Sequence, residues 1–262
     1  MRINGLDGHY SQILMNSKPV FSALAGVYGL EHIPATMIDR VEVMRGGGSA
    51  LFGSSAIGGT SNIITKDPVT NSAEISHNIT SIGMGGSLDN NTTVNASVVN
   101  GNSKSGLFIY GQSRNREAYD HNDDGFTEIG TIKAKTLGIN SFYNISSNSK
   151  LRAEYSTTDE FRRGGDQLDR PAHQAYIAEQ TDHKINAANV TFDAWSDDYS
   201  NKYNIYTALR DTKRDSYYGS NMDPNAYGST HDLVVVGGAQ YVHTFTKLWF
   251  MPAEFISGIE YN

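Results

Sequence analysis

Residues 38–66 read IDRVEVMRGGGSALFGSSAIGGTSNIITK and form the most informative stretch of the chain. Strand-like runs at 41–44 and 62–65 lie towards its two ends. Between them is GGGSALFGSSAIGG, residues 46–59, where glycine is so frequent that tight turns and close backbone approach are expected instead of a helix. The stretch therefore predicts two strands joined by a glycine-rich loop.

The residues around this stretch predict a small α+β domain over residues 1–67. A further strand-like run lies at 12–15, and a short helix is expected over 34–38. This part holds five basic and five acidic residues, so its net charge is zero. It ends at Lys66-Asp67-Pro68, where a proline follows a strand-like run. We place a domain boundary there, with a second domain over residues 68–262.

Composition excludes several classes of protein. The chain has 262 residues and a net charge of −7, all of which falls in residues 68–262. It has no cysteine, which excludes disulfides, thiolate zinc sites and a cysteine nucleophile. No run of 18 apolar residues predicts a transmembrane helix. The acidic balance argues against a nucleic-acid partner.

Residues 68–262 show a period of two. Leu151, Ala153 and Tyr155 alternate with Arg152 and Glu154, as expected for a strand with one apolar face. Comparable segments give nine expected strands, at 73–82, 91–100, 105–114, 131–145, 150–160, 183–195, 202–213, 231–245 and 249–262.

The connections between these segments alternate in length. Short turns are expected at 101–104, 146–149, 196–201 and 246–247, and long loops at 115–130, 161–182 and 214–230. Outer-membrane barrels have short periplasmic turns and long extracellular loops. Trp249 and Tyr261 lie at opposite ends of one expected strand, where aromatic girdles belong. We predict a transmembrane antiparallel β-barrel, with a soluble all-β sandwich as the alternative.

Residues 38–66 closely resemble the end of the plug domain of TonB-dependent outer-membrane receptors. The similarity covers Asp39 to Val43, the pair Arg45-Gly46, SALFG at 49–53, AIGG at 56–59 and NIIT at 62–65. Residues 3–20 resemble the preceding plug strands, with Asn16-Ser17 where the family has Asp-Gly. The resemblance implies a plug enclosed by a 22-stranded barrel. About nine strands are expected here, and neither a TonB box nor the first plug strands are recognised, so the chain is interpreted as a fragment.

The resemblance also implies a function and partners. Receptors of this family import a scarce, bulky ligand across the outer membrane of Gram-negative bacteria with energy from the TonB–ExbB–ExbD system. Outer-membrane lipid and a surface lipoprotein are further expected partners, and no covalent cofactor is expected. Arg40, Glu42 and Arg45 alternate along the 41–44 strand, so we expect them to pair with interior charges such as Lys150, Arg152, Glu154 or Glu254. The plug signature residues are Arg40, Glu42, Arg45, Gly46, Gly53, Gly58 and Gly59.

The ligand is expected to be an iron–siderophore complex, haem or cobalamin. Residues 21–30, FSALAGVYGL, lie where cobalamin receptors contact their substrate, and Phe21, Leu24 and Tyr28 offer an apolar face to a macrocycle. Residues 161–183 resemble a stretch of Bacteroidetes receptors of the haem and cobalamin type. Their arginines could bind propionate or phosphate groups. These are Arg162, Arg163 and Arg170, and the histidines available to haem are His9, His32, His121, His173 and His231.

The loop at 115–130 contains half of a calcium-binding pattern. Asp120, Asn122 and Asp124 precede Gly125, as in a loop that wraps a hard cation with alternate side-chain oxygens. Thr131 stands where an EF-hand has its bidentate glutamate, so an EF-hand is excluded. A looser calcium site and a plain surface loop with an Asx turn both stay open.

Enzymatic function is not expected. Gly46-x-Gly48 is followed by Leu51 where a dinucleotide fingerprint has glycine. Neither a P-loop, a G-x-S-x-G elbow nor an H-E-x-x-H motif is present. Two alternatives to import remain: a soluble or surface-attached β-rich module that binds glycans, and a receptor that signals inward through an N-terminal extension.

Overall fold

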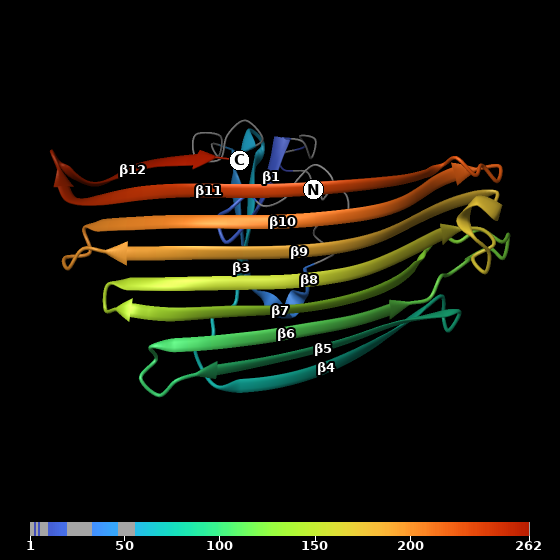
Figure 1. The fold of residues 1–262 in the computed structure, drawn as a ribbon, viewed down its shortest axis with the longest axis horizontal. Coiled ribbons are helices and arrows are strands. Elements are labelled where there is room, and N and C mark those ends of the chain that lie inside the picture. The colour runs from blue at the N-terminus through green and yellow to red at the C-terminus, as the bar shows by residue number, and fades with distance from the viewer. Residues whose placement is uncertain (1–2, 4, 6–9, 20–32, 47–55, 262) are drawn as a thin grey trace.

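The structure is a computed structural model that describes residues 3, 5, 10–19, 33–46 and 56–261. Nearly all of its regular structure is β-strand, arranged in two sheets (Figure 1). We call the three-stranded sheet the inner sheet and the nine-stranded sheet the wall. Among the described residues, none of the helical segments has the length and apolarity needed to span a bilayer.

The inner sheet contains β1 (Ser11–Met15), β2 (Ile38–Arg45) and β3 (Gly59–Thr65) in the order β1-β3-β2. β3 pairs in parallel with β1 and antiparallel with β2. The central strand β3 is buried although four of its residues are polar: Thr60, Ser61, Asn62 and Thr65. The helix expected over 34–38 is a single 3-10 turn, η3 (Ala35–Met37), because the backbone is extended on both sides of it.

The wall is an antiparallel meander in which every strand pairs with its neighbours in the chain. Its strands are β4 (Ser72–Ile82), β5 (Ser87–Val99), β6 (Ser105–Arg116), β7 (Thr131–Ser146), β8 (Ser149–Gly165), β9 (Ile177–Trp195), β10 (Asn201–Ser220), β11 (Tyr227–Leu248) and β12 (Met251–Tyr261). A second 3-10 turn, η5 (Ala172–Gln174), lies between β8 and β9. The nine predicted strands are therefore confirmed in number and order.

The two ends of the wall differ. The turn end holds the connections 100–104, 147–148, 196–200 and 249–250, and the loop end holds 83–86, 117–130, 166–176 and 221–226. In Figure 1 the turn end is at the left and the loop end at the right. The predicted lengths of the loops 161–182 and 214–230 were wrong, because β8 to β11 continue through much of both ranges. The last turn is at Trp249 and Phe250, three residues later than expected.

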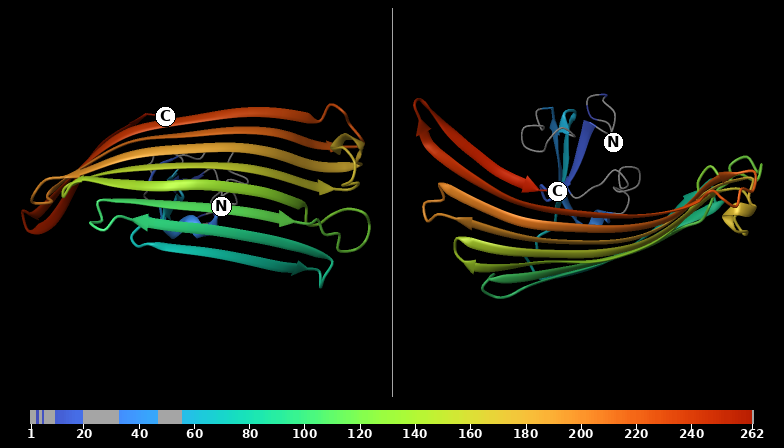
Figure 2. Two further views of the ribbon diagram at one scale, coloured as in Figure 1. Left: turned by 60° about the horizontal axis from the view of Figure 1, so that its bottom comes forward. Right: turned by 45° about the horizontal axis from the view of Figure 1, so that its top comes forward.

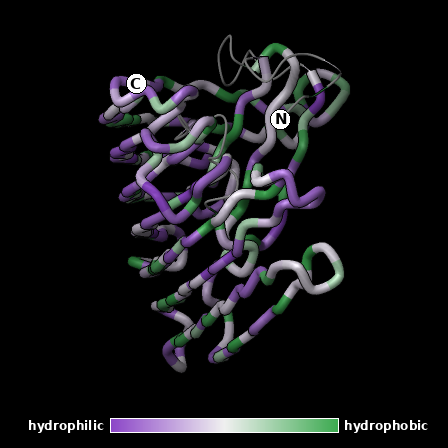
Figure 3. The backbone as a smooth tube through the Cα atoms, turned by 90° about the vertical axis from the view of Figure 1, so that its right-hand side faces the viewer, coloured by the Kyte–Doolittle hydropathy of each residue, from purple (hydrophilic) through white to green (hydrophobic). Residues whose placement is uncertain are grey.

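The wall is curved, and the inner sheet lies in its hollow (Figure 2). Side chains that point to the hollow are mostly polar, and several are buried there, among them Asn140, Thr158, Thr191 and Asp193. The convex face is apolar and exposed. Its exposed residues include Leu137, Ile139, Leu151, Tyr155, Val190, Tyr203, Ile205, Leu209, Leu233 and Val235. Figure 3 shows this alternation of hydrophobic and hydrophilic residues along the strands.

This distribution is the reverse of that in a soluble sandwich, which hides its apolar face. In transmembrane barrels every second residue of a strand is apolar and faces outward, and the wall has the same pattern. β9, β10 and β11 have 19, 20 and 22 residues. These lengths are about twice the 9–11 residues of tilted strand that cross a bilayer.

Candidate functional site between the inner sheet and the wall

The inner sheet meets the wall at Glu154, near the middle of β8. The side-chain amide of Asn16 donates to both carboxylate oxygens of Glu154, at 2.8 and 3.0 Å. The hydroxyl of Thr65 donates to the same carboxylate at 3.3 Å, and the amide of Asn189 donates to it from β9 at 3.1 Å. One carboxylate therefore receives hydrogen bonds from both the inner sheet and the wall.

Asn16 reaches the wall because it begins a tight turn after β1. Asn16 and Ser17 have φ values of 49° and 65°, in the left-handed region that asparagine tolerates better than most residues. The Asn16 backbone N–H donates to the Ile63 carbonyl at 2.9 Å, and the Ser17 N–H donates to the Asn62 side chain at 2.8 Å. The turn is thus fixed to β3 and holds the Asn16 amide towards the wall.

Lys18 follows the turn and is almost fully buried against the wall, with 5% of its surface exposed. Its ammonium donates to the Thr191 hydroxyl at 2.6 Å and lies 5.4 Å from the centre of the Tyr206 ring. Burial lowers the pKa of Lys18 to about 8, although the nearby Glu154 carboxylate opposes this shift. The contact therefore places a basic group in a poorly hydrated site.

A third contact ties the segment between the two sheets to the wall. The Lys150 ammonium lies 2.9 Å from the Asp67 carboxylate, and the Arg152 guanidinium lies 3.6 Å from it. Arg152 also bonds to Asp193 at 2.5 Å, and the Asn204 amide donates to Asp193 at 2.8 Å. These residues extend the network across β8, β9 and β10. We call the contacts at Glu154, Lys18 and Asp67 the seam.

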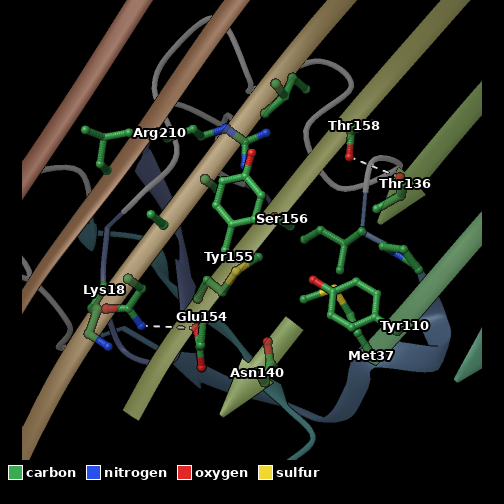
Figure 4. Close-up of a pocket in the computed structure, with 18 residues that line it drawn as sticks. Lys18, Met37, Tyr110, Thr136, Asn140, Glu154, Tyr155, Ser156, Thr158 and Arg210 are labelled. Atoms are coloured by element: carbon green, nitrogen blue, oxygen red, sulfur yellow. Dashed lines mark hydrogen bonds between the residues drawn. The ribbon is translucent and has the colours of Figure 1, made fainter. Parts of the chain in front are cut away.

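A small cavity of about 60 Å³ lies beside the seam (Figure 4). On its floor Met37 packs against Phe108 and Tyr110, which gives the interface one apolar patch. Glu154 and Lys18 border the cavity on the other side. The side-chain amide of Asn140 donates to the Lys66 carbonyl at 3.4 Å nearby. The interface is thus mainly polar, with apolar packing around Met37, to which Met15, Ile33 and Ile38 contribute.

The expected pairing of the β2 charges with the wall is wrong for the described residues. Arg40 pairs with Asp39 at 2.8 Å and with Glu42 at 2.9 Å, within its own strand. Arg45 is exposed. The wall charge Glu154 is instead bound by Asn16, and Glu254 accepts a bond from Thr244 at 3.4 Å. Charges on an exposed strand satisfy one another locally, whereas the buried turn supplies the long-range contact.

The glycine-rich turn after β2 needs glycine for steric reasons. Gly46 has a φ of 69° and Gly59 a φ of 135°. A Cβ on Gly59 would lie 2.3 Å from the Met44 carbonyl oxygen. The Gly46 N–H donates to the Gly58 carbonyl at 3.3 Å, and the Gly58 N–H donates to Tyr10 at 2.7 Å. Gly53 lies outside the described residues.

A larger pocket of about 650 Å³ lies at the loop end. Arg162 and Arg163 line it from β8 and are not in a loop as expected. Arg162 binds Glu160 through two bonds of 2.6 and 3.1 Å. Arg163 donates to the carbonyls of Gly164 at 3.0 Å and Asp166 at 3.2 Å. These two bonds hold Arg163 to the backbone at the end of β8, which is a structural role.

The other predicted ligand residues are not brought together with these two. Arg170 lies in the 166–176 connection and does not line the pocket. Phe21, Leu24 and Tyr28 lie outside the described residues, as do His9 and His32. The remaining histidines bond within the loop end and on the outer face: His121 to Tyr119, His173 to Tyr227 and His231 to Asp211, at 3.1, 2.9 and 2.5 Å.

The loop 117–130 folds around its acidic residues. Asp120 accepts bonds from the N–H groups of Asn122 and Gly125, at 3.2 and 2.8 Å. Asp124 accepts from the Phe126 N–H at 2.9 Å. These are Asx-type turns. Within the described part of the chain, His, Asp and Glu side chains form no group of three arranged to hold a metal ion.

The residues of the seam were not predicted as a set. Lys150, Arg152 and Glu154 were expected to face the interior, and Asn16 was noted as a turn residue of the plug resemblance. Lys18, Thr191 and Asp67 were not predicted as contacts. One available signal is an Asn-Ser turn next to a lysine, immediately before Pro19. A lysine at such a turn loses water when the turn packs against the wall, so its ammonium needs a hydrogen-bond acceptor there.

Comparison with known proteins adds family information. Residues 1–60 match the model of the TonB-dependent Receptor Plug Domain. A curated relative, the vitamin B12 transporter BtuB of Photobacterium profundum, is 32% identical over 144 residues, which are 49% of this chain and 23% of that protein. The ferric enterobactin receptor PirA of Pseudomonas aeruginosa is 37% identical over 76 residues, 25% of this chain and 10% of that protein.

Solved structures resemble the whole fold at low identity. The siderophore receptor PirA from Acinetobacter baumannii matches 99% of this chain and 41% of its own, with a TM-score of 0.80 and 18% identity. The pyoverdine receptor FpvA from Pseudomonas aeruginosa matches 95% of this chain and 38% of its own, with a TM-score of 0.70 and 11% identity. The chain thus covers under a quarter of the curated relatives and about two fifths of these structures.

Proposed function

We propose that the chain is part of a TonB-dependent receptor and that the intact protein imports a scarce, bulky ligand across the bacterial outer membrane. The inner sheet is then part of the plug, and the wall is part of the barrel around it. The ligand class is an iron–siderophore complex, haem or cobalamin, and the energy comes from TonB with its ExbB and ExbD partners.

The observation that carries this proposal is a small sheet held inside a curved wall by a polar seam. A rigid scaffold would bury apolar surface between the two bodies, whereas Glu154, Lys18 and Asp67 are held chiefly by hydrogen bonds and ion pairs. Such bonds can be exchanged for bonds to water when the bodies separate. A plug that must move aside while the barrel stays folded requires this kind of contact.

The convex face supports a membrane location. Leu137, Tyr155 and Leu209 are exposed on it at 56%, 45% and 38%, and the band that they belong to crosses the wall. A soluble glycan-binding module would have to leave this band in water, which is unfavourable. We therefore place the loop end outside the cell and the turn end in the periplasm, as in other outer-membrane barrels.

The loop end supports a ligand of substantial size. Its pocket is about 650 Å³ and combines the ring of Phe126 with charged groups of Arg116, Glu128 and Arg162. A mixture of aromatic and charged surface is suited to a macrocycle or metal chelate with polar substituents. The relatives named as vitamin B12 transporter and ferric enterobactin receptor bind ligands of this kind.

Uptake measurements test the proposal. Cells expressing the full-length receptor are given radiolabelled cyanocobalamin, haemin or a ferric catecholate, with TonB present or deleted. We expect accumulation of one ligand that depends on TonB and is lost when the receptor gene is deleted. Accumulation of none of them would contradict the ligand class, and accumulation that persists without TonB would contradict energised import.

A further inference from the structure

Two tyrosines of the wall lie along its concave face, each across a glycine of the next strand. Tyr206 of β10 is directly opposite Gly238 of β11, and Gly238 is directly opposite Glu260 of β12. The Tyr206 hydroxyl donates to the Glu260 carboxylate. The side chain therefore follows the row of paired residues, passes over Gly238 and reaches a partner two strands away.

Tyr110 repeats this arrangement on an earlier group of three strands. Tyr110 of β6 is directly opposite Gly138 of β7, which is directly opposite Ser156 of β8. The Tyr110 and Ser156 hydroxyls are hydrogen-bonded. A tyrosine, a glycine and a polar partner on three successive strands thus form a pattern that recurs in the wall.

Glycine allows each ring to lie close to the sheet. A Cβ on Gly238 would lie 2.6 Å from the Cζ atom of Tyr206, and a Cβ on Gly138 would overlap the Tyr110 ring. Carbon atoms pack at about 3.5–4.0 Å, so either ring would have to rise from the sheet. A glycine within a strand weakens the strand and often marks the close approach of another group. The neighbouring Gly237 differs, because a Cβ there would lie 4.0 Å from the Tyr206 carbonyl oxygen, which is an ordinary contact.

Each ring carries a contact from a segment that flanks the inner sheet. The Lys18 ammonium lies 5.4 Å from the centre of the Tyr206 ring, and Met37 packs against Tyr110 (Figure 4). A ring face attracts a cation through its quadrupole, and it also makes favourable contacts with a thioether. Both tyrosine hydroxyls are bonded within the wall, so they keep their partners when the inner sheet separates from it.

We propose that Tyr110 and Tyr206 are positioning residues for the plug: their rings set the depth at which it rests in the wall, and Gly138 and Gly238 keep the rings low. The proposal rests on the assignment of the inner sheet to a movable plug. A ring face, unlike a carboxylate, needs no replacement hydrogen bond when its partner leaves. The two rings therefore guide the plug into place and add little to the cost of releasing it.

The test compares alanine at the two neighbouring glycines of β11 in the full-length receptor. Gly238→Ala should lift the Tyr206 ring and speed hydrogen exchange of the β1 and β3 amides about 10-fold, the size expected for overpacking. Gly237→Ala is the matched control and should leave this exchange unchanged. The amides of β9 should keep their protection in both variants, because the wall keeps its own strand pairing.

Variants of Tyr206 show whether the glycine acts through the ring. Tyr206→Phe keeps the ring and should protect the plug as the unaltered receptor does, whereas Tyr206→Ala should not. In the Tyr206→Ala background, Gly238→Ala should add no further acceleration, since no ring remains to be lifted. These variants also carry the test if Gly238→Ala alone does not assemble.

Equal exchange of the plug in Gly238→Ala and Gly237→Ala would overturn the proposal, as would full protection of the plug in Tyr206→Ala. Independent effects of Gly238→Ala and Tyr206→Ala would overturn it too, and so would a loss of protection shared equally by plug and wall, which indicates a general packing fault. Failure of the proposed function is recognised separately: hydrogen exchange requires neither ligand nor TonB, so a receptor that imports nothing still gives these results.

Discussion

Replacing Glu154 by alanine should loosen the plug without unfolding the barrel. The carboxylate accepts the Asn16 amide at 2.8 and 3.0 Å and the Thr65 hydroxyl at 3.3 Å, so two groups of the plug lose their acceptor. A hydrogen bond to a charged group contributes about 1.5–3 kcal/mol, and the longer Thr65 bond adds less. Because the site is only part-buried and water can replace the carboxylate, we take about 2 kcal/mol for the set, which corresponds to an opening equilibrium raised about 30-fold.

Hydrogen exchange of the full-length receptor measures this opening. The amides of β1 and β3 should exchange about 30-fold faster in Glu154→Ala, while the amides of β7 to β10 keep their protection. Glu254→Ala is the matched control, since Glu254 also faces the interior but bonds to Thr244 of the wall. Glu154→Gln, which keeps an acceptor oxygen, should give an intermediate effect. Equal exchange of the plug in all variants would refute the role assigned to Glu154.

Further predictions concern the plug, the membrane face and the acidic loop. Gly59→Val should prevent assembly of the receptor in the outer membrane, because its φ of 135° and the adjacent carbonyl leave no room for a side chain; a normal amount of heat-modifiable receptor would contradict this. The pKa of Lys18 is about 8 when it is buried against Thr191 and 10.5 when it is exposed to water. Between these pH values, the state in which the plug has moved away from the wall therefore binds more protons. The free energy needed to separate the plug from the wall should therefore increase as the pH rises from 8 to 10.5, by up to about 1.4 kcal/mol per pH unit. Hydrogen exchange corrected for its intrinsic pH dependence should show this trend in the unaltered receptor and lose it in Lys18→Met. Leu209→Lys should cost about 2–4 kcal/mol if it faces the bilayer midplane, as measured by urea unfolding in vesicles, and no loss would argue against a lipid-facing position. Calcium should protect the loop 117–130 from proteolysis, and Asp120→Asn with Asp124→Asn should remove that protection; a loop cleaved equally with calcium and with chelator would leave only the Asx turns.

Much of the wall was predictable because its alternation is local. Leu151 and Tyr155 on the convex face and Glu154 on the concave face follow from a period of two. The order of the strands follows from their short connections. The need for glycine at Gly46 and Gly59 was equally predictable, and both residues adopt a positive φ.

The ends of the strands were harder to predict. Arg162 and Arg163 were expected in a loop but continue β8, and Asp215 continues β10 in the same way. Near the loop end both faces of these strands carry polar residues, so the alternation that identifies a strand disappears while its backbone pairing continues. The period of two therefore identifies the part of a strand that has one apolar face, and it underestimates the full length of the strand.

The contacts of the seam could not be predicted from the sequence, for a different reason. Asn16 and Glu154 are 138 residues apart, and nothing in the neighbourhood of either residue identifies the other. Arg40 and Glu42 looked like the better partners because they are charged, yet they satisfy each other two residues apart. Local pairing of opposite charges competes with any long-range pairing, and here it prevails on the exposed strand.

The burial of polar residues on β3 has a thermal consequence. Thr60, Ser61, Asn62 and Thr65 are each at most 8% exposed in the centre of the plug sheet. Unfolding would hydrate polar surface, which lowers the heat capacity, and would hydrate less of the apolar surface that raises it. The stability of the plug should therefore have a flat temperature dependence compared with that of an ordinary domain core. A receptor built in this way would keep its plug about equally firm in cold and warm surroundings.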